Sequence, residues 1–371
     1  MNAAEPSPTI DFALLGHPDS YDHLGDILVH SRPDYDREKL GKYQATLSKF
    51  FEWAPSYVAK TPLEIENAAG QKLSGRLVIC TFLPEKIAGP REMKIAYNKA
   101  RVGYGVAREL GANMVGLGGF TSIVGGSQGE RLVRELGGAV TSGNSLTAAL
   151  ALAQLDALLE RLNGDLRGRT VAILGATGDI GRACAMALAP RAGHLLLVAR
   201  NRVKLKQFQA ELSEQVSTTI VTDVKQAASA DIIVAATSAT QPILSEADLK
   251  TGAIVCDIGY PKNLSYSSAP RPDVLVISAG LAEMPFELDI QYYTRLPTAR
   301  QIFGCFAEAM VLTMNGQYES YSVGQGRITL EKMGYILNMA QEQGFRPAPL
   351  YRGDESITDA DIELFLEKNH K

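Results

Sequence analysis

Short, nearly continuous apolar runs alternate with helical stretches through the middle of the chain. An Ala/Leu-rich helical stretch starts near Leu146, and the apolar runs that follow are TVAIL, HLLLVAR (194–200), STTIVT (217–222), DIIVAAT (231–237), AIVCDIG (253–259) and DVLVIS (273–278). Strands of a parallel sheet have this pattern because helices bury both faces of the sheet. The sequence therefore predicts an α/β fold with a Rossmann-type doubly wound parallel sheet.

The regions on either side of these strands are less regular. Before them, SGRLVICTFLPE predicts a strand, residues 91–110 a helix, and VGLGGFTSIVGG (115–126) a strand that leads into a tight loop. After Pro285, the stretches TARQIFGCFAEAMVLTMNG, ITLEKMGYILNMAQEQG and DADIELFLEKNHK predict helices. We expect an N-terminal α/β substrate domain (1–145), the sheet domain (146–290) and a C-terminal helical region (291–371).

Composition narrows the class of protein. The 371 residues are 46% apolar and 21% charged with a net charge of −4, which is typical of a globular protein and argues against general nucleic-acid binding. Neither a signal peptide nor a long uncharged apolar run is present, so we expect no transmembrane segment. The four cysteines form no CxxC pair, which favours the reducing cytoplasm and predicts neither a disulfide framework nor a metal site.

A glycine motif lies between the first of these strands and the following helix. Gly175, Gly178 and Gly181 form GxxGxxG, in which missing Cβ atoms let the backbone approach a pyrophosphate at a helix N-terminus. A tight structural turn is the alternative, but the repeated strands favour a dinucleotide. The predicted binding loop comprises Gly175, Ala176, Thr177, Gly178, Asp179, Ile180 and Gly181.

The next strand ends in Arg200-Asn201-Arg202, where an NAD enzyme usually carries an acidic residue. Arginine there can hold a 2′-phosphate, so the sequence favours NADPH, with a solvated helix start as the alternative. Later strand ends should reach the same edge of the sheet and add Thr237, Ser238, Gly259 and Tyr260 to the cofactor site.

The cysteines differ in their surroundings. Cys184 and Cys256 lie in an apolar helix and strand and are typical of buried hydrophobes, while Cys80 is ambiguous. Cys305 follows Gly304 near a helix start, where partial positive charge can lower a thiol pKa. However, Thr298 and Gln301 are spaced like a capping box, which would start the helix earlier and place Cys305 in its second turn. Gly304 could instead mark a break or a close approach of the backbone, and the sequence leaves these interpretations open.

Seven strings in order resemble the cyanobacterial long-chain acyl-[acyl-carrier-protein] reductases: SGRLVICTFLPE, LGGFTSI, TSGN, GATGDIGRA, GYPKNL, FGCFAEAM and ITLEKM. The resemblance extends from about Phe12 to Leu350, but the segment from His17 to Tyr43 departs from it. It implies NADPH-dependent reduction of fatty acyl-ACP, or acyl-CoA, to a fatty aldehyde for alkane synthesis. It also implies that Cys305 carries the acyl group as a thioester.

The resemblance further implies an acidic carrier protein as partner and an aldehyde-consuming enzyme downstream. A basic stretch with Glu92 as its one acidic residue is a docking candidate, with a solvated helix face as the alternative. Its cationic residues are Lys86, Arg91, Lys94, Lys99, Arg101 and Arg108.

Thr121, Ser122 and Lys262 are the candidates to assist Cys305, because they lie in turns that could face the nicotinamide. Ser142, Asn144, Tyr260 and Asn263 lie in turns of the same kind, and the alternative for all seven residues is a role as a turn or cap residue. His17 is more typical of a structural histidine. Two other functions fit the dinucleotide motif: a dehydrogenase of the shikimate or methylene-folate kind without covalent catalysis, and a non-catalytic NADP-binding sensor.

Overall fold

The computed structural model describes residues 9–32, 34, 36–125, 129–267, 271–324 and 326–369. Gly126 of the glycine-rich stretch and the last two residues of the predicted tail helix lie outside these ranges. The chain forms two compact units. Unit 1 comprises Met1–Gly143, Met284–Gly324 and Asn338–Phe345, and unit 2 comprises Asn144–Glu283, Gln325–Leu337 and Arg346–Lys371. The predicted C-terminal region is thus divided between the two units.

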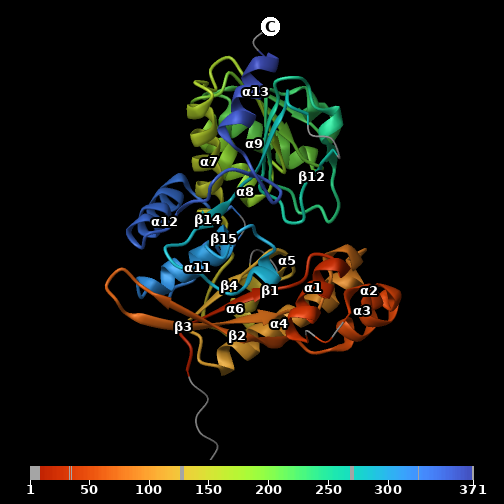
Figure 1. Cartoon of the computed structure of the whole chain (residues 1–371). Coiled ribbons are helices and arrows are strands. Elements are labelled where there is room, and N and C mark those ends of the chain that lie inside the picture. Colours follow the sequence, from red (N-terminus) through yellow and green to blue (C-terminus); the bar gives the residue numbers. More distant parts are fainter. Residues whose placement is uncertain are drawn as a thin grey trace, which may run out of the picture. The chain divides into compact units, whose positions relative to one another are not determined.

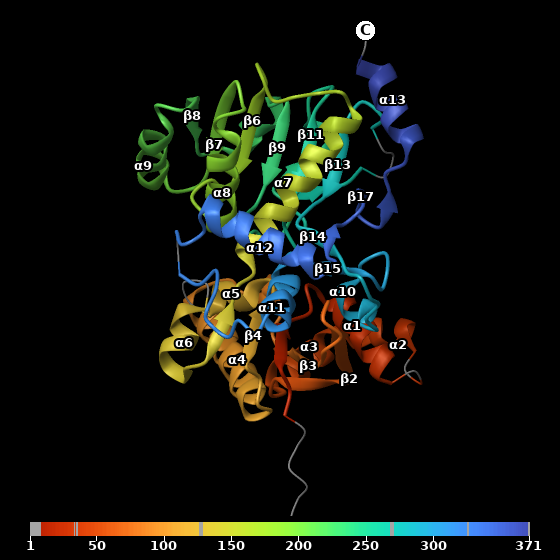
Figure 2. The ribbon, with the colours of Figure 1, turned by 90° about the vertical axis from the view of Figure 1, so that its left-hand side faces the viewer.

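Unit 2 contains a six-stranded sheet with the order β13-β11-β9-β6-β7-β8, and its neighbouring strands are parallel (Figure 2). Counted from β6, this is the strand order of a doubly wound Rossmann sheet, so the predicted fold class is confirmed. The strands are β6 (Thr170–Leu174), β7 (His194–Val198), β8 (Ser217–Val221), β9 (Ile232–Ala235), β11 (Ile254–Asp257) and β13 (Leu275–Ser278).

Both faces of this sheet are buried. Val171 and Ile173 of β6 share a core with Leu155 of α7 and Leu188 of α8, whereas Ala172 belongs to a second core on the opposite face. This explains the continuous apolar runs. The helices of unit 2 are α7 (Asn144–Arg161), α8 (Asp179–Leu188), α9 (Arg202–Leu212) and α13 (Asp359–Asn369), with 3-10 turns η2 (Val224–Ser229) and η3 (Glu246–Asp248). Short strands complete it: β10 (Leu244–Ser245), β12 (Leu264–Ser265), β14 (Leu281–Glu283), β16 (Arg346–Pro347), β17 (Tyr351–Arg352) and β18 (Glu355–Ser356).

Unit 1 contains a five-stranded sheet with the order β2-β3-β1-β4-β5 (Figure 1). Strand β2 is antiparallel to β3, while β3, β1, β4 and β5 are parallel. Their bounds are β1 (Phe12–Gly16), β2 (Tyr57–Glu66), β3 (Lys72–Ile79), β4 (Met114–Leu117) and β5 (Ala139–Thr141). The carboxyl ends of the parallel strands therefore meet at one edge, where open α/β sheets usually bind ligands.

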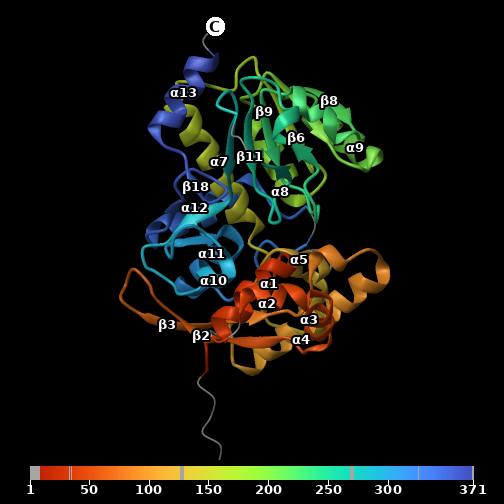
Figure 3. The same cartoon turned by 45° about the vertical axis from the view of Figure 1, so that its right-hand side comes forward.

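Helices cover both faces of this sheet. Leu15 and Val115 share a core with Tyr104 of α4 (Pro90–Glu109), whereas Gly116 faces Ala309 of α11 (Gly304–Met314). The other elements of unit 1 are α1 (Tyr21–Ser31), α2 (Arg37–Lys42), α3 (Gln44–Trp53), η1 (Pro84–Lys86), α5 (Phe120–Val124), α6 (Glu130–Leu136), α10 (Gln291–Thr294) and β15 (Gln301–Phe303). Figure 3 shows α1, α2 and α3 beside one another. The boundary between the units falls inside α12 (Leu330–Glu342).

One predicted helix begins later than the sequence indicated. Gln301 lies in β15 with a buried side chain, and its backbone N–H donates to the carbonyl oxygen of Thr298 at 3.2 Å. The capping-box interpretation is therefore wrong, and α11 starts at Gly304. Within the described ranges, no helix combines the length and hydropathy that crossing a bilayer requires.

Candidate active site

Cys305 is the second residue of α11 and lies in its first turn. The N-cap position is Phe303, which provides no side-chain hydrogen bond to the helix. The first backbone N–H groups of a helix have no partner within that helix, so they leave partial positive charge around the thiol. The structure thus supports the interpretation that Cys305 lies at the start of the helix and not in its second turn.

The four cysteines, all within the described residues, differ in exposure. Cys80, Cys184 and Cys256 are buried, and Cys305 is partly exposed. Burial raises the pKa of the Cys305 thiol to about 11, although backbone N–H groups of Gly119, Phe306 and Cys305 itself lower it. The loss of hydration therefore raises the pKa of this thiol more than the helix N-terminus lowers it. The Cys305 thiol is therefore mostly protonated at neutral pH, and its thiolate fraction grows as pH rises.

Glycines at the carboxyl edge of the sheet allow α11 to approach closely. Gly143 follows β5 with φ +70, and a Cβ there would lie 2.0 Å from the Cα of Cys305. A Cβ on Gly118, after β4, would lie 2.4 Å from the ring of Phe306. The strings LGGFTSI, TSGN and FGCFAEAM therefore meet in space, and a larger residue at Gly143 or Gly118 would displace the thiol.

A buried polar link connects β5 to the same helix. The N–H of Gly143 donates to the hydroxyl oxygen of Thr141 at 3.0 Å, so that hydroxyl donates its own proton to the carboxylate of Glu308. Glu308 is fully buried in α11, three residues after Cys305. The link fixes the Gly143 turn against the thiol. Sequence reasoning missed both residues, although a glutamate within the apolar string FGCFAEAM was a signal.

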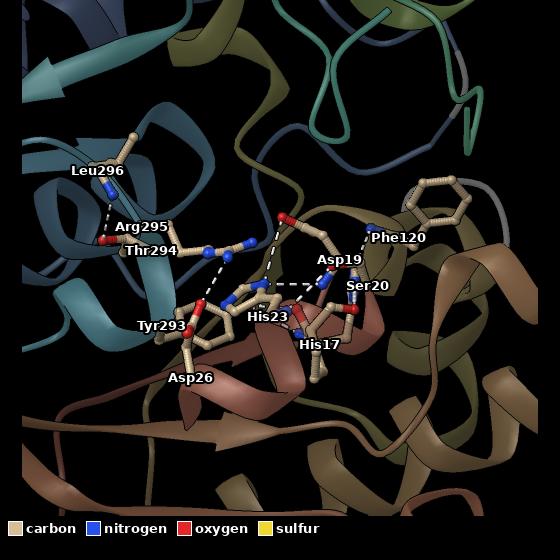
Figure 4. A network of polar contacts seen from close by, with 11 residues as sticks. His17, Asp19, Ser20, His23, Asp26, Phe120, Tyr293, Thr294, Arg295 and Leu296 are labelled. Atoms are coloured by element: carbon tan, nitrogen blue, oxygen red, sulfur yellow. Dashed lines mark hydrogen bonds and ion pairs between the residues drawn. The ribbon is translucent and has the colours of Figure 1, made fainter. Parts of the chain in front are cut away.

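The loop after β1 reaches the same edge of the sheet (Figure 4). The hydroxyl of Tyr293 accepts the backbone N–H of His17 at 2.9 Å and donates to its carbonyl oxygen at 3.2 Å. The backbone N–H of Asp19 donates to Nδ1 of His23 at 3.0 Å. Burial raises the pKa of Tyr293 well above its ordinary value, so this hydroxyl remains a neutral hydrogen-bonding group. Sequence reasoning did not find Tyr293.

The other predicted catalytic residues are engaged with the backbone. The hydroxyls of Thr121 and Ser122 donate to the carbonyl oxygens of Gly118 and Gly119 at 2.8 and 2.9 Å. In unit 2, Nζ of Lys262 donates to the carbonyl oxygen of Asp257 at 3.2 Å and lies 3.7 Å from the ring centroid of Tyr260. These contacts give each residue a structural role, and a catalytic role for any of them stays a prediction.

Unit 2 has a cavity of about 650 Å³ at the carboxyl ends of its central strands. Many predicted cofactor residues line it, namely Gly175, Thr177, Gly178, Arg200, Asn201, Thr237 and Ser238. Other predicted residues are not among its lining residues, namely Ala176, Asp179, Ile180, Gly181, Arg202, Gly259 and Tyr260. Lys204, Thr222 and Asp223 line the cavity and were missed, since the sequence motif does not extend to them.

The motif's glycines have separate roles that fit a dinucleotide. A Cβ on Gly175 would lie 2.3 Å from the carbonyl oxygen of Ala236, and one on Gly181 would lie 2.3 Å from that of Gly175. Both glycines are therefore needed for packing. A Cβ on Gly178 would have one neighbour within 4 Å, the carbonyl oxygen of Gly175 at 3.2 Å. Gly178 lines the cavity at the N-terminus of α8, which leaves space for a pyrophosphate. Asp179 instead accepts the N–H of Gly326 at 2.7 Å.

The basic side of this cavity is formed around the start of α9. Arg200 and Lys204 line the cavity and are exposed. The side-chain oxygen of Asn201 accepts the N–H of Lys204 at 3.0 Å, so Asn201 caps the helix. This cap fixes the backbone from which both cations extend.

The approach of Gly143 to Cys305 predicts a specific stability effect. Gly143→Ala should lower the free energy of unfolding by about 3 kcal/mol or more, because it adds a backbone clash to the cost of positive φ. Gly316→Ala is the control, since Gly316 has φ +64 in open space and should cost only about 1–2 kcal/mol. Urea denaturation of both variants measures the difference, and equal losses would contradict the proposed clash.

Three comparisons place the chain among known proteins. The Shikimate / quinate 5-dehydrogenase family model matches residues 157–278. The long-chain acyl-[acyl-carrier-protein] reductase of Synechococcus elongatus is 33% identical over 351 residues, which cover 91% of this chain and 99% of that protein. The aminotransferase PigE of a Serratia strain is 31% identical over 255 residues, covering 67% of this chain and 30% of PigE.

Solved structures are more distant. L-tryptophan dehydrogenase from Nostoc punctiforme is 10% identical with a TM-score of 0.33, over 91% of this chain and 82% of that chain. The nucleotide-binding domain of glutamyl-tRNA reductase from Thermoplasma volcanium is 20% identical with a TM-score of 0.25, over 34% and 84%. These scores are too low to support an argument.

The shikimate-type match is confined to part of unit 2, whereas the reductase match extends over nearly the whole chain. This distribution favours the reductase over the shikimate-type alternative and confirms the resemblance found in the sequence. The sheet topology, the cavity and the shikimate-type match also agree on a nicotinamide cofactor in unit 2. The chain belongs to the family of long-chain acyl-[acyl-carrier-protein] reductases and is an oxidoreductase.

Proposed function

We propose that this protein reduces long-chain fatty acyl groups, delivered on acyl carrier protein, to fatty aldehydes, with NADPH as the reductant and Cys305 as the point of acyl attachment. The observation that carries the proposal is the position of Cys305, a partly exposed residue in the first turn of α11. Acyl-CoA is a second possible donor, since it offers the same thioester.

Acyl transfer exchanges one thioester for another. Sγ of Cys305 attacks the carbonyl carbon of the carrier thioester, the bond to the carrier sulfur breaks, and the proton from Cys305 ends on the released carrier thiol. The raised pKa of Cys305 keeps the resting thiol protonated, which limits side reactions between turnovers. Attack then depends on the small thiolate fraction and on proton transfer as the acyl group arrives.

Reduction follows on the acyl-enzyme. NADPH, when bound in unit 2, supplies a hydride to the thioester carbonyl carbon. The carbonyl electron pair moves to oxygen and gives a thiohemiacetal anion on Cys305. This anion collapses, the C–S bond breaks, and the products are a fatty aldehyde and the Cys305 thiolate, which takes up a proton.

The proposal predicts that Cys305→Ser abolishes aldehyde formation. A serine hydroxyl is barely ionised at neutral pH and its ester is a poorer hydride acceptor, so activity should fall by at least about 10³-fold while NADPH binding persists. Cys256→Ser is the matched control, because a hydroxyl can replace the contact of its Sγ with the carbonyl oxygen of Ala151 at 3.7 Å. Aldehyde release is the readout, and substantial activity in Cys305→Ser would refute the covalent route.

Selectivity for NADPH should depend on the cations that line the cavity. Replacing both Arg200 and Lys204 by Ala should raise the KM for NADPH about tenfold or more and that for NADH much less, because only NADPH carries a 2′-phosphate. Arg202→Ala provides the comparison, since Arg202 is exposed but does not line the cavity. Initial rates with each cofactor measure the effect, and equal changes for NADPH and NADH would argue against a 2′-phosphate site.

Fewer cations are available to dock the carrier protein than the sequence indicated. Nζ of Lys99 donates to the carbonyl oxygen of Ala54, and Arg108 donates to that of Ala112, so both charges already contact backbone within unit 1. The remaining cations of α4, Arg91, Lys94 and Arg101, are exposed.

These three cations share a face of the helix because their spacing matches its repeat. Ile95 and Val102 lie beside them with 45% and 44% of their surfaces exposed. This combination suits an acidic helix with apolar side chains, and we name these five residues the α4 stripe. A solvated helix face is the alternative interpretation.

Charge reversal of the α4 stripe tests this docking site. Arg91→Glu, Lys94→Glu and Arg101→Glu together should lower kcat/KM for acyl-ACP by about tenfold or more and reduce its salt sensitivity, because steering of an acidic partner is lost. Activity with acyl-CoA should change much less.

The matched control reverses the same number of charges on α2 and α3, at the exposed residues Lys39, Lys42 and Lys49. If both triple variants lose equal activity with acyl-ACP, the effect is one of overall charge and the α4 stripe is not the docking site.

A further inference from the structure

The two ring nitrogens of His17 have opposite hydrogen-bonding roles (Figure 4). Nε2 lies 2.9 Å from the backbone nitrogen of Phe120, and a backbone N–H can only donate, so Nε2 is the acceptor. Nδ1 lies 3.0 Å from the carbonyl oxygen of Pro18, which can only accept, so Nδ1 carries the proton. These contacts select the neutral ring with its proton on Nδ1. Both nitrogens contact backbone, which makes His17 unsuited to proton shuttling.

The ring of His17 is enclosed and held in place. It is buried and stacks on Phe82 with 4.8 Å between ring centroids, and it meets Phe120 edge-on at 5.9 Å. The backbone N–H and carbonyl of the same residue are held by Tyr293. His17 therefore provides a fixed acceptor at the carboxyl end of β1.

The hydrogen bond from the backbone N–H of Phe120 to His17 helps to fix the conformation of Gly119. The N–H of Phe120 belongs to the peptide that follows Gly119, and Gly119 has φ +54 and ψ −129, which glycine adopts readily and other residues do not. A Cβ on Gly119 would lie 2.9 Å from Nε2 of His17. Loss of the acceptor would free this turn to relax.

The Gly118–Phe120 turn packs against the first turn of α11, because a Cβ on Gly118 would lie 2.4 Å from the ring of Phe306, the residue after Cys305. The backbone N–H groups of Gly119, Phe306 and Cys305 lower the pKa of the Cys305 thiol, so they favour negative charge at this place. Backbone donors from the turn before α5 and from the first turn of α11 therefore converge on one site, the arrangement that stabilises an oxyanion in acyl-transfer enzymes.

We propose that His17 is a positioning residue for thioester reduction, which holds the Gly118–Phe120 turn so that the backbone N–H of Gly119, together with the first turn of α11, binds the oxygen of the Cys305 thioester as it becomes negative. The inference rests on the proposed function, since it requires an acyl group on Cys305. During reduction, the hydride adds to carbon and the carbonyl electron pair moves to this oxygen, where the donors receive it.

Two substitutions separate the nitrogens of His17. In His17→Gln, the amide oxygen reaches the position of Nε2 and can accept the N–H of Phe120. In His17→Asn, the shorter amide reaches only the position of Nδ1 and can serve only Pro18. Removing one oxyanion donor typically costs about 10²–10³-fold in rate. We expect His17→Asn to slow reduction about a hundredfold and His17→Gln to restore most of that loss.

The pH profile provides a readout that a purely structural role would not change. Burial lowers the pKa of His17 from its ordinary value of 6.5, while Asp19 raises it and His23 lowers it. The titratable and charged groups around this site also include Tyr293 and Arg295 beside α10, Cys305 and Glu308 on α11, and Cys80 after β3. Protonation of Nε2 would place two N–H groups against each other. The wild-type rate of reduction should therefore show an acid step that lies below the pH of an ordinary histidine, and the rate in His17→Gln should not show this step, because an amide does not titrate.

The experiment begins with enzyme acylated on Cys305 by palmitoyl-ACP and verified by intact mass, so that acylation does not limit the rate. Aldehyde release is then followed in a single turnover with excess NADPH between about pH 5 and pH 8, with the Tm of each variant measured at the same pH. A slow His17→Asn, a rescued His17→Gln and a lost acid step at unchanged Tm would support the proposal.

Wild-type reduction rates in His17→Asn, or an unchanged acid step in His17→Gln, would overturn the role of His17 while leaving the acyl-enzyme intact. Failure of the wild-type enzyme to acquire the acyl mass would instead refute the proposed function. If His17→Asn does not fold, the pH profile of His17→Gln alone decides the question. A positioning role predicts that this variant loses the acid step, whereas a purely structural role predicts that the step is unchanged.

Discussion

The close approach between the first turn of α11 and the glycine turn after β5 is the constraint on which the site depends. No side chain fits between Gly143 and Cys305, and the Thr141–Glu308 link fixes the turn on the side of β5. Gly118 gives the ring of Phe306 its place on the side of β4. The thiol is therefore positioned by the close backbone approach at Gly143, with support from the side chains of Thr141, Glu308 and Phe306.

This construction explains the electrostatics of Cys305. A packed helix start removes water from the thiol, which raises its pKa to about 11, while the same packing directs backbone N–H groups towards it. Such donors stabilise a transient oxyanion without permanently ionising the sulfur. Under the proposed function, the thiol of the resting enzyme is protonated, and the backbone N–H groups bind the oxygen of the acyl group once it is attached.

The sequence predicted the parts of the fold that repeat a simple pattern. Continuous apolar runs identified the parallel strands of unit 2, and GxxGxxG located a glycine loop that lines the cavity of this unit. The separate roles of the motif's glycines could not be predicted from their spacing, because Gly178 lines the cavity whereas Gly181 packs against Gly175. Lys204 was missed since it reaches the cavity from α9, one helical turn after Arg200.

The acyl site was harder to predict because it depends on residues distant in sequence. Thr141, Glu308 and Tyr293 acquire their roles only when strand ends and helix starts meet. His17 resembled an ordinary buried histidine, and the hydrogen-bonding roles of its two nitrogens appeared only with the fold. The apparent capping box failed because a three-residue strand, β15, precedes α11.

The most direct measurement is peptide mass spectrometry of the enzyme after incubation with palmitoyl-ACP in the absence of NADPH. We expect one palmitoyl group per chain, attached to the peptide that contains Cys305, and its loss as aldehyde when NADPH is added. An adduct on Cys80, Cys184 or Cys256, or aldehyde formation without any adduct on Cys305, would contradict this expectation.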